Sequence, residues 1–156
     1  MSLTFGYSSP RDLLEKARRD LVNLEGAAVT QDTTTIGDAL FNFAVTAYHV
    51  KDWLKLHAAV TYSPQDVENF VQSSAALSSC RDLCNAGKHA EITRYSPSTA
   101  DVSASLNSVA AVVPGGLATP IVRVKIIRND GTRREAVQLA TEAISDWERF
   151  FDEHGL

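Results

Sequence analysis

The stretch CRDLCNAGKH, residues 80–89, gathers five side chains that can take part in acid–base or phosphate chemistry. On a helix, Asp82, Asn85 and His89 lie at positions i, i+3 and i+7 and share one face, with Arg81 and Lys88 beside it. A histidine with a pKa near neutrality can act as a general base on a hydroxyl group. This helix is therefore the candidate catalytic site.

Metal-free cleavage of RNA is the chemistry that suits these residues. The 2′-hydroxyl attacks the adjacent phosphate once a base removes its proton, and a cation or an amide steadies the phosphoryl oxygens. In this hypothesis His89 is the base, Lys88 or Arg81 supplies the positive charge, and Asn85 orients the phosphate or donates a hydrogen bond to it. The reaction needs no cofactor, and none is expected.

The same residues also have a purely structural interpretation. Arg81, Asp82 and Lys88 would be solvated surface charges, while Asn85 and His89 would satisfy the carbonyl groups at the end of the helix. One polar helix face is a weakly specific signal, and residue chemistry alone favours this second interpretation.

The segment AYHVKDWLK supplies His49 and Asp52 as contributors from a second helix. At 1.5 Å per residue, an antiparallel neighbour would not bring His49 level with His89 in one chain, although a dimer could. The paired Glu and Glu-x-x-His helices of di-metal bundles are absent, so no metal site is predicted. Cys80 and Cys84 have neither disulfide geometry nor zinc-knuckle spacing, so they are interpreted as packing residues.

The segment IVRVKIIRNDGTRRE is predicted to be a β-hairpin, because Val122, Val124 and Ile126 alternate with polar residues and NDG suits a turn. This hairpin holds 5 of the 15 basic residues of the chain, namely Arg123, Lys125, Arg128, Arg133 and Arg134. They could form a surface that binds the phosphates of a nucleic acid. An edge strand kept soluble by charge would look the same, so both interpretations stay open.

Composition excludes several classes of protein. With 156 residues, 44% hydrophobic and 22% charged, the chain has the composition of one globular domain. Its net charge of −4 gives no overall attraction to nucleic acid, so RNA binding would need a local basic patch. No apolar run approaches the ~18–20 residues of a membrane span, and the N-terminus lacks the features of a secretion signal. A cytoplasmic location without membrane association is expected.

Hydrophobic periodicity predicts a mainly α protein of the α+β class. Apolar residues recur at helical spacing over residues 10–25, 34–56, 64–89 and 136–153. Residues 100–135 alternate instead and predict two or three strands. Because each helix must bury its apolar stripe, we expect an antiparallel four-helix up-and-down bundle with a small antiparallel β insertion before the last helix.

The segments FNFAVTAYHVKDWL and CRDLCNAGKHAEI resemble the HEPN-like helical-bundle superfamily. Active members of that superfamily are metal-independent ribonucleases, often dimeric, whose signature is an arginine followed by a histidine. In this chain Arg81 and His89 would be that pair, separated by DLCNAGK rather than by the four to six residues of the signature. Non-catalytic members are binding modules. The resemblance covers about residues 10–95 and the last helix.

These observations lead to two expectations of function. The first is a homodimeric, HEPN-like ribonuclease or RNA-binding protein from a mobile-element or defence setting. The alternative is a catalytically inert bundle that binds a partner protein.

Overall fold

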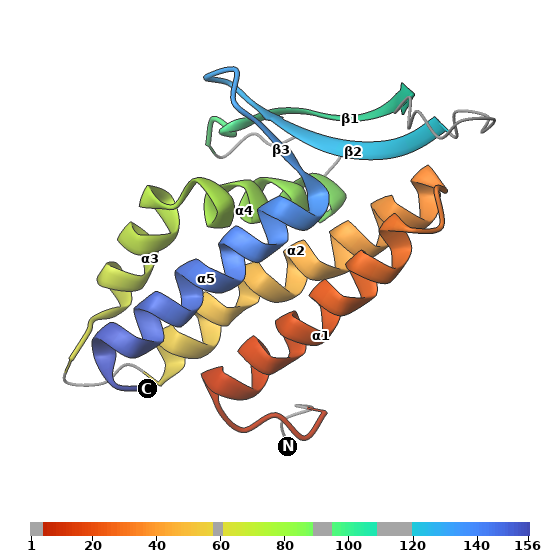
Figure 1. Cartoon of the computed structure of the whole chain (residues 1–156). Coiled ribbons are helices and arrows are strands. Elements are labelled where there is room, and N and C mark those ends of the chain that lie inside the picture. The colour runs from red at the N-terminus through yellow and green to blue at the C-terminus, as the bar shows by residue number, and fades with distance from the viewer. Residues whose placement is uncertain (1–4, 58–60, 89–94, 109–119) are drawn as a thin grey trace.

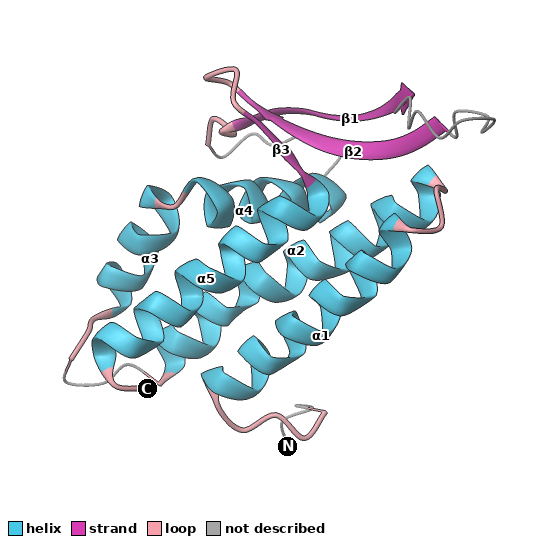
Figure 2. Cartoon of the chain, viewed as in Figure 1, coloured by secondary structure: helices cyan, strands magenta, loops and turns pink. Residues whose placement is uncertain are grey.

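The computed structural model of the chain describes residues 5–57, 61–88, 95–108 and 120–156, which form five helices and one three-stranded sheet. Figures 1 and 2 show the helices gathered in one body, with the sheet lying across α4 and the start of α5. The prediction of a mainly helical chain with a small antiparallel sheet is confirmed. In chain order the elements are α1 (Pro10–Ala28), α2 (Thr33–Leu56), α3 (Pro64–Ser73), α4 (Ala75–Lys88), β1 (Thr99–Ser108), β2 (Pro120–Arg128), β3 (Arg133–Glu135) and α5 (Ala136–His154).

Capping boxes begin two of the helices. The side chain of Ser9 accepts a hydrogen bond from the backbone N–H of Asp12, and the Asp12 carboxylate accepts one from the Ser9 N–H in return. Ser63 and Asp66 form the same capping box at α3. Helix α1 was predicted to end at residue 25 but continues through Gly26 to Ala28. The extra turn buries Ala27 in the core, which offsets the weak helix propensity of glycine.

The prediction of a single helix over residues 64–89 is wrong, because the helix is interrupted at Ser74. The backbone of Ser74 is extended, with φ −80° and ψ 124°. Its hydroxyl oxygen accepts a hydrogen bond from the Leu77 N–H at 2.9 Å and so caps α4, while the hydroxyl donates to Asp146 of α5 at 2.5 Å. The described residues therefore contain five helices where the sequence predicted four. The Ser74 hydroxyl takes the place of a backbone acceptor at this interruption. The apolar pattern continues across it, which is why the sequence suggested one helix.

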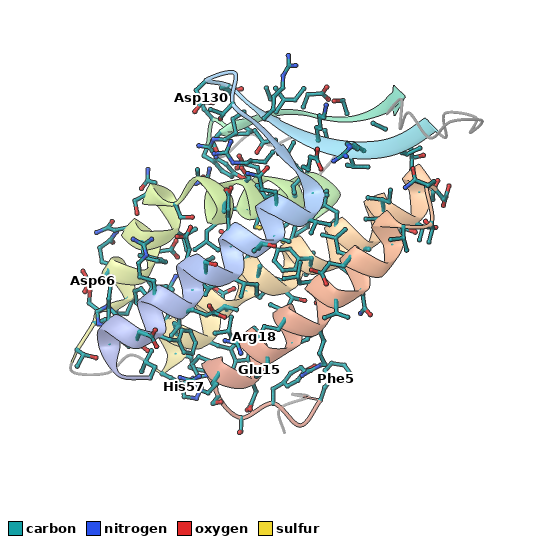
Figure 3. The ribbon with its side chains drawn as sticks, in the orientation of Figure 1. Phe5, Glu15, Arg18, His57, Asp66 and Asp130 are labelled. Atoms are coloured by element: carbon teal, nitrogen blue, oxygen red, sulfur yellow. The ribbon has the colours of Figure 1, made fainter. Side chains whose placement is uncertain are left out.

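The sheet has strand order β1-β2-β3 and is antiparallel throughout. Val124 and Ile126 of β2 are buried against the helices, which confirms the predicted alternation. Gly131 has a φ of +82° at the turn after β2, where the Asp130 carboxylate accepts hydrogen bonds from Thr132. Figure 3 labels Asp130 at the tip of this turn, far from Phe5 near the start of α1.

One hydrophobic core joins the helices and the inner side of β2. Its largest fully buried side chains include Trp147, Phe150 and Phe151 of α5 and Phe43 of α2. The indole N–H of Trp147 donates to the carbonyl oxygen of Ala47 at 2.8 Å, which satisfies the one polar group of that side chain. Trp147 is thus a core residue.

Candidate functional site

Asp82 lies at the centre of the predicted catalytic face, and it is buried. Only 3% of the residue is exposed. One carboxylate oxygen accepts hydrogen bonds from the Arg81 guanidinium at 3.0 and 3.1 Å. The other accepts from the N–H and hydroxyl of Ser98, both at 2.7 Å, and from the N–H of Thr99 at 2.8 Å. Asp82 therefore fastens the beginning of β1 to α4, and both of its oxygens are committed to that contact.

Arg81 and Asn85 hold the same segment through Tyr95. The Arg81 guanidinium lies over the Tyr95 ring, 4.4 Å from the ring centroid. The amide of Asn85 donates to the Tyr95 hydroxyl at 2.9 Å. Burial raises the pKa of the Tyr95 hydroxyl above its ordinary value. Arg81, Asp82 and Asn85 are thus brought together, but by residues 95–99 of their own chain.

The remaining two members of the predicted catalytic set lie at the end of α4. Lys88 is the last residue of the helix and is exposed. His89, the predicted base, lies outside the described residues. Its role as a base therefore stays a prediction.

Three of the five basic residues of the hairpin are engaged within the chain. Arg123 forms an ion pair with Glu135 at 2.6 Å, and Arg134 forms one with Glu142 at 3.0 Å. Arg128 donates to the carbonyl oxygen of Ala75 at 2.8 Å and to the hydroxyls of two serines in α4. Lys125 and Arg133 form no side-chain hydrogen bond or ion pair with another described residue. Arg123 and Arg134 remain partly exposed in their ion pairs, so phosphate binding by this surface stays a prediction.

The α2 residues His49 and Asp52 do not form a pair. Asp52 binds Lys51 at 3.0 Å, and Lys51 also contacts Glu68 of α3 at 3.2 Å. Burial opposes the charge on Lys51, but the carboxylates of Asp52 and Glu68 raise its pKa above the ordinary value. Asp52 therefore belongs to an ionic contact between α2 and α3, while His49 is exposed and forms no ion pair with another described residue.

The end of α4 packs against the first half of α2. Gly87 packs directly on Phe41, so closely that a Cβ atom at position 87 would overlap the Phe41 ring. Phe41 precedes His49 by two turns of α2. The described end of α4 therefore lies nearer the beginning of α2 than His49 does.

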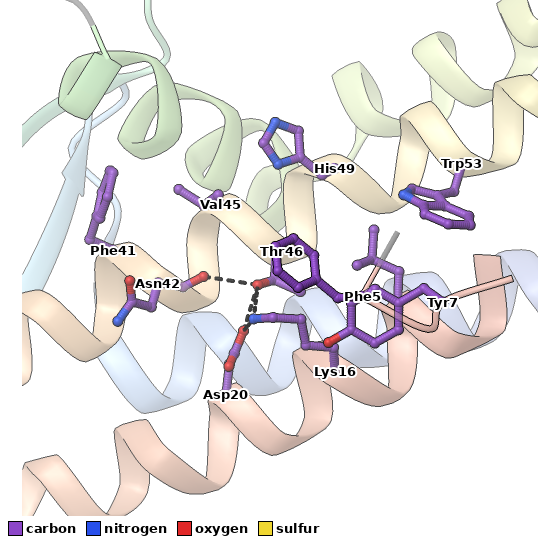
Figure 4. Close-up of a pocket in the computed structure, with 11 residues that line it drawn as sticks. Phe5, Tyr7, Lys16, Asp20, Phe41, Asn42, Val45, Thr46, His49 and Trp53 are labelled. Carbon is purple, nitrogen blue, oxygen red and sulfur yellow. Dashed lines mark hydrogen bonds and ion pairs between the residues drawn. The ribbon is translucent and has the colours of Figure 1, made fainter. Parts of the chain in front are cut away.

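A groove between α1 and α2 was not predicted from the sequence. It has a volume of about 480 Å³, and Figure 4 shows its lining side chains. Phe41, Val45, His49 and Trp53 follow one another at intervals of four residues along α2, and Leu13 lies opposite on α1. Other lining residues come from the N-terminal segment, from α1 and from α2: Phe5, Tyr7, Lys16, Asp20, Asn42 and Thr46.

The floor of the groove carries a closed polar network. The Lys16 ammonium donates to Asp20 at 2.6 Å and to the Thr46 hydroxyl at 2.8 Å. The Thr46 hydroxyl donates to Asp20 at 2.5 Å. Dashed lines in Figure 4 mark these contacts. The charges of Lys16 and Asp20 offset each other inside the groove. The groove thus presents aromatic surface around a locally neutral polar centre.

The chain has no match among protein-family models, curated proteins or solved structures. The candidate site rests on its own geometry.

Residues 5–57, 61–88, 95–108 and 120–156 contain neither a cluster of metal-binding side chains nor a membrane-spanning helix. No three His, Cys, Asp or Glu residues in these ranges come together as metal ligands would. No helix in them has the length and apolar character of a membrane span. Cys80 and Cys84 are free and buried, and burial raises the pKa of the Cys80 thiol to about 12.

The groove has a signal in the sequence, although a weak one. Phe41, Val45, His49 and Trp53 form a stripe at i+4 spacing beside the main apolar seam of α2. A second stripe on a helix indicates a second contact surface. The contribution of Lys16 and Asp20 has no such signal, because an i, i+4 ion pair is common on any exposed helix.

Proposed function

We propose that this chain is a non-catalytic binding module whose groove between α1 and α2 takes an apolar segment of a partner protein. The observation that carries the proposal is the aromatic lining of the groove. Phe41 is 41% exposed although it is large and apolar. Phe5 and Tyr7 lie along the same groove. Aromatic side chains of this kind supply the anchoring contacts of protein interfaces.

Charge favours a protein segment over RNA in this groove. Lys16 is the one lysine or arginine among the lining residues, and Asp20 neutralises it. Binding of nucleic acid depends on cations that are free to replace counterions along the phosphates. The net charge of −4 adds no attraction. An apolar segment needs no such cations, and its backbone can form hydrogen bonds with Lys16 and Asp20.

Selection of peptides from a random displayed library against the purified full-length chain tests this proposal. Trp53 lines the groove whereas Trp147 is buried, so a change in tryptophan emission on titration reports occupancy of the groove. The expected result is a selected peptide whose affinity falls at least tenfold in the Phe41→Lys variant. Val22→Lys is the matched control, since Val22 is exposed on α1 and does not line the groove. Equal binding to both variants would contradict the proposal.

Cleavage of RNA by a HEPN-like mechanism is the second candidate. Lys88 favours it, because this exposed cation forms no ion pair with another described residue and directly precedes His89 in the sequence. The commitment of Arg81 and Asp82 to the chain's own structure weighs against it. A ribonuclease assay in EDTA on wild type and His89→Ala decides the matter. Cleavage that survives chelation and disappears in the variant would support the mechanism, and absence of cleavage by the folded wild type would reject it.

A further inference from the structure

Strand β1 forms an unprotected edge of the sheet. It pairs with β2 along its length, and in the part of the chain that the structure describes no strand pairs with its other side. The strand has ten residues, TADVSASLNS, of which Asp101 alone is charged. Exposed edges in monomeric proteins are usually short, or carry lysine, proline or bulges that prevent pairing. The one irregularity in β1 lies at its beginning, between Thr99 and Asp101.

The opposite edge of the same sheet shows the protection that β1 lacks. Strand β3 has three residues, Arg133, Arg134 and Glu135, and all of them are charged. A short, charged edge gives an incoming strand few backbone partners and unfavourable neighbours. Among the described strands, β1 is therefore the longest edge without a charged covering strand.

The helices that cover the inner side of β2 leave apolar residues on the same side of β1 exposed. Val102 is opposite Ile126, and Ala104 is opposite Val124, and directly opposed residues lie on the same side of a sheet. Ile126 and Val124 are buried, yet Val102 is 44% exposed and Ala104 is exposed as well. Beneath this part of β1 is a hollow of about 210 Å³, whose lining includes Leu83, Ala86 and Val102.

A second copy of the chain fits this edge. Antiparallel strands related by a two-fold axis pair with themselves, so the same surface serves both copies. Asp101 is the one charged residue of β1, so no other like charges come into opposition when two copies of the strand pair. Asp101 lies near one end of the strand, so the axis places the two Asp101 carboxylates at opposite ends of the pair. Self-pairing therefore meets no electrostatic obstacle.

We propose that β1 pairs antiparallel with β1 of a second copy, which makes a continuous six-stranded sheet in the order β3-β2-β1-β1′-β2′-β3′. The partner's sheet and α4 then cover the hollow beneath Val102. This proposal is independent of the groove between α1 and α2, which lies on other elements and stays open in the dimer.

The molar mass of the full-length chain, measured by sedimentation over a wide range of concentration, tests the proposal. Wild type is expected at twice the 17.0 kDa of one chain. Val102→Lys and Ala104→Lys should raise the dimer dissociation constant at least about a hundredfold, because each symmetric interface would bury two unpaired ammonium groups. Val22→Lys, which changes a residue that is 64% exposed on α1, should leave the dimer intact.

Hydrogen exchange separates a lost interface from a lost fold. In wild type, the β1 amides that point away from β2 should be protected at high concentration and should lose protection on dilution. In Val102→Lys those amides should exchange at every concentration while β2 stays protected. A monomeric wild type overturns the proposal. A dimer that the Val102→Lys and Ala104→Lys substitutions weaken no more than the Val22→Lys substitution overturns it as well.

Discussion

The polar face of α4 and the groove between α1 and α2 differ in how their side chains are used. On α4, Arg81, Asp82 and Asn85 are satisfied by residues 95–99 of the same chain. In the groove, Phe41 and His49 are exposed, and His49 forms no hydrogen bond with another described residue. The face that is richer in reactive groups holds the fold together, and the less polar groove is open to a ligand.

This difference shows what residue types alone do not reveal. A carboxylate beside an arginine can be a catalytic pair or a structural one, and the number of intramolecular hydrogen bonds distinguishes them. Asp82 accepts five such bonds. A carboxylate so fully engaged has little capacity left for a substrate.

Removal of the Asp82 carboxylate should have the largest effect on stability. In Asp82→Ala the N–H groups of Ser98 and Thr99 lose their acceptor, and Arg81 loses its counter-ion. Breaking a buried pair of this kind costs about 3–5 kcal/mol. Urea denaturation followed by circular dichroism measures the loss. A loss below ~1 kcal/mol would be that of an ordinary surface residue, and would contradict the claim that the polar face of α4 stabilises the fold.

A methyl group at Gly87 should have the next largest effect. In Gly87→Ala the new Cβ displaces the Phe41 ring, at a cost of about 1–3 kcal/mol, offset in part by the better helix propensity of alanine. In a Phe41→Ala background the same substitution should instead stabilise the chain by up to ~1 kcal/mol. A double-mutant cycle from urea denaturation measures this reversal. Identical effects in both backgrounds would contradict the contact between α4 and the edge of the groove.

Acid should destabilise the chain through its helix caps. Hydrogen bonds from Ser63 lower the pKa of Asp66 below its ordinary value of 3.8, and those from Ser8 and Ser9 lower the pKa of Asp12 in the same way. A lowered pKa in the folded state means stability that is present above pH 3.8 and lost as the pH falls below it. Thermal unfolding of wild type and Asp66→Ala measured from neutral pH to pH 2 should show a shallower pH dependence in the variant. Parallel curves would show that Asp66 does not contribute.

The groove residue His49 should have the smallest effect on stability. Its side chain is exposed and forms no hydrogen bond with another described residue, so His49→Ala should change the free energy of unfolding by no more than ~0.5 kcal/mol. The same variant should bind groove-selected peptides more weakly, measured by Trp53 emission. A large loss of stability would show that His49 supports the fold, and would contradict the claim that the groove side chains are available for binding.

Local patterns were sufficient to predict most of the helices. Apolar periodicity predicted helix starts at residues 10 and 64, and α1 and α3 begin there because Ser9 and Ser63 cap them within one turn. The alternation of Val124 and Ile126 predicted which side of β2 is buried, since side chains alternate along any strand. The break at Ser74 was missed, because the acceptor of its hydroxyl proton is Asp146, seventy-two residues later in the chain.

The sequence by itself determined the class of the fold, the caps and the choice of candidate residues, all of which depend on neighbours in the chain. Only the tertiary structure decided what those residues do. It placed Ser98 and Tyr95 on the polar face of α4, laid α1 beside α2 to form the groove, and left β1 at an open edge of the sheet. Such contacts join residues that are distant in sequence, and local periodicity does not specify which distant residues pack together.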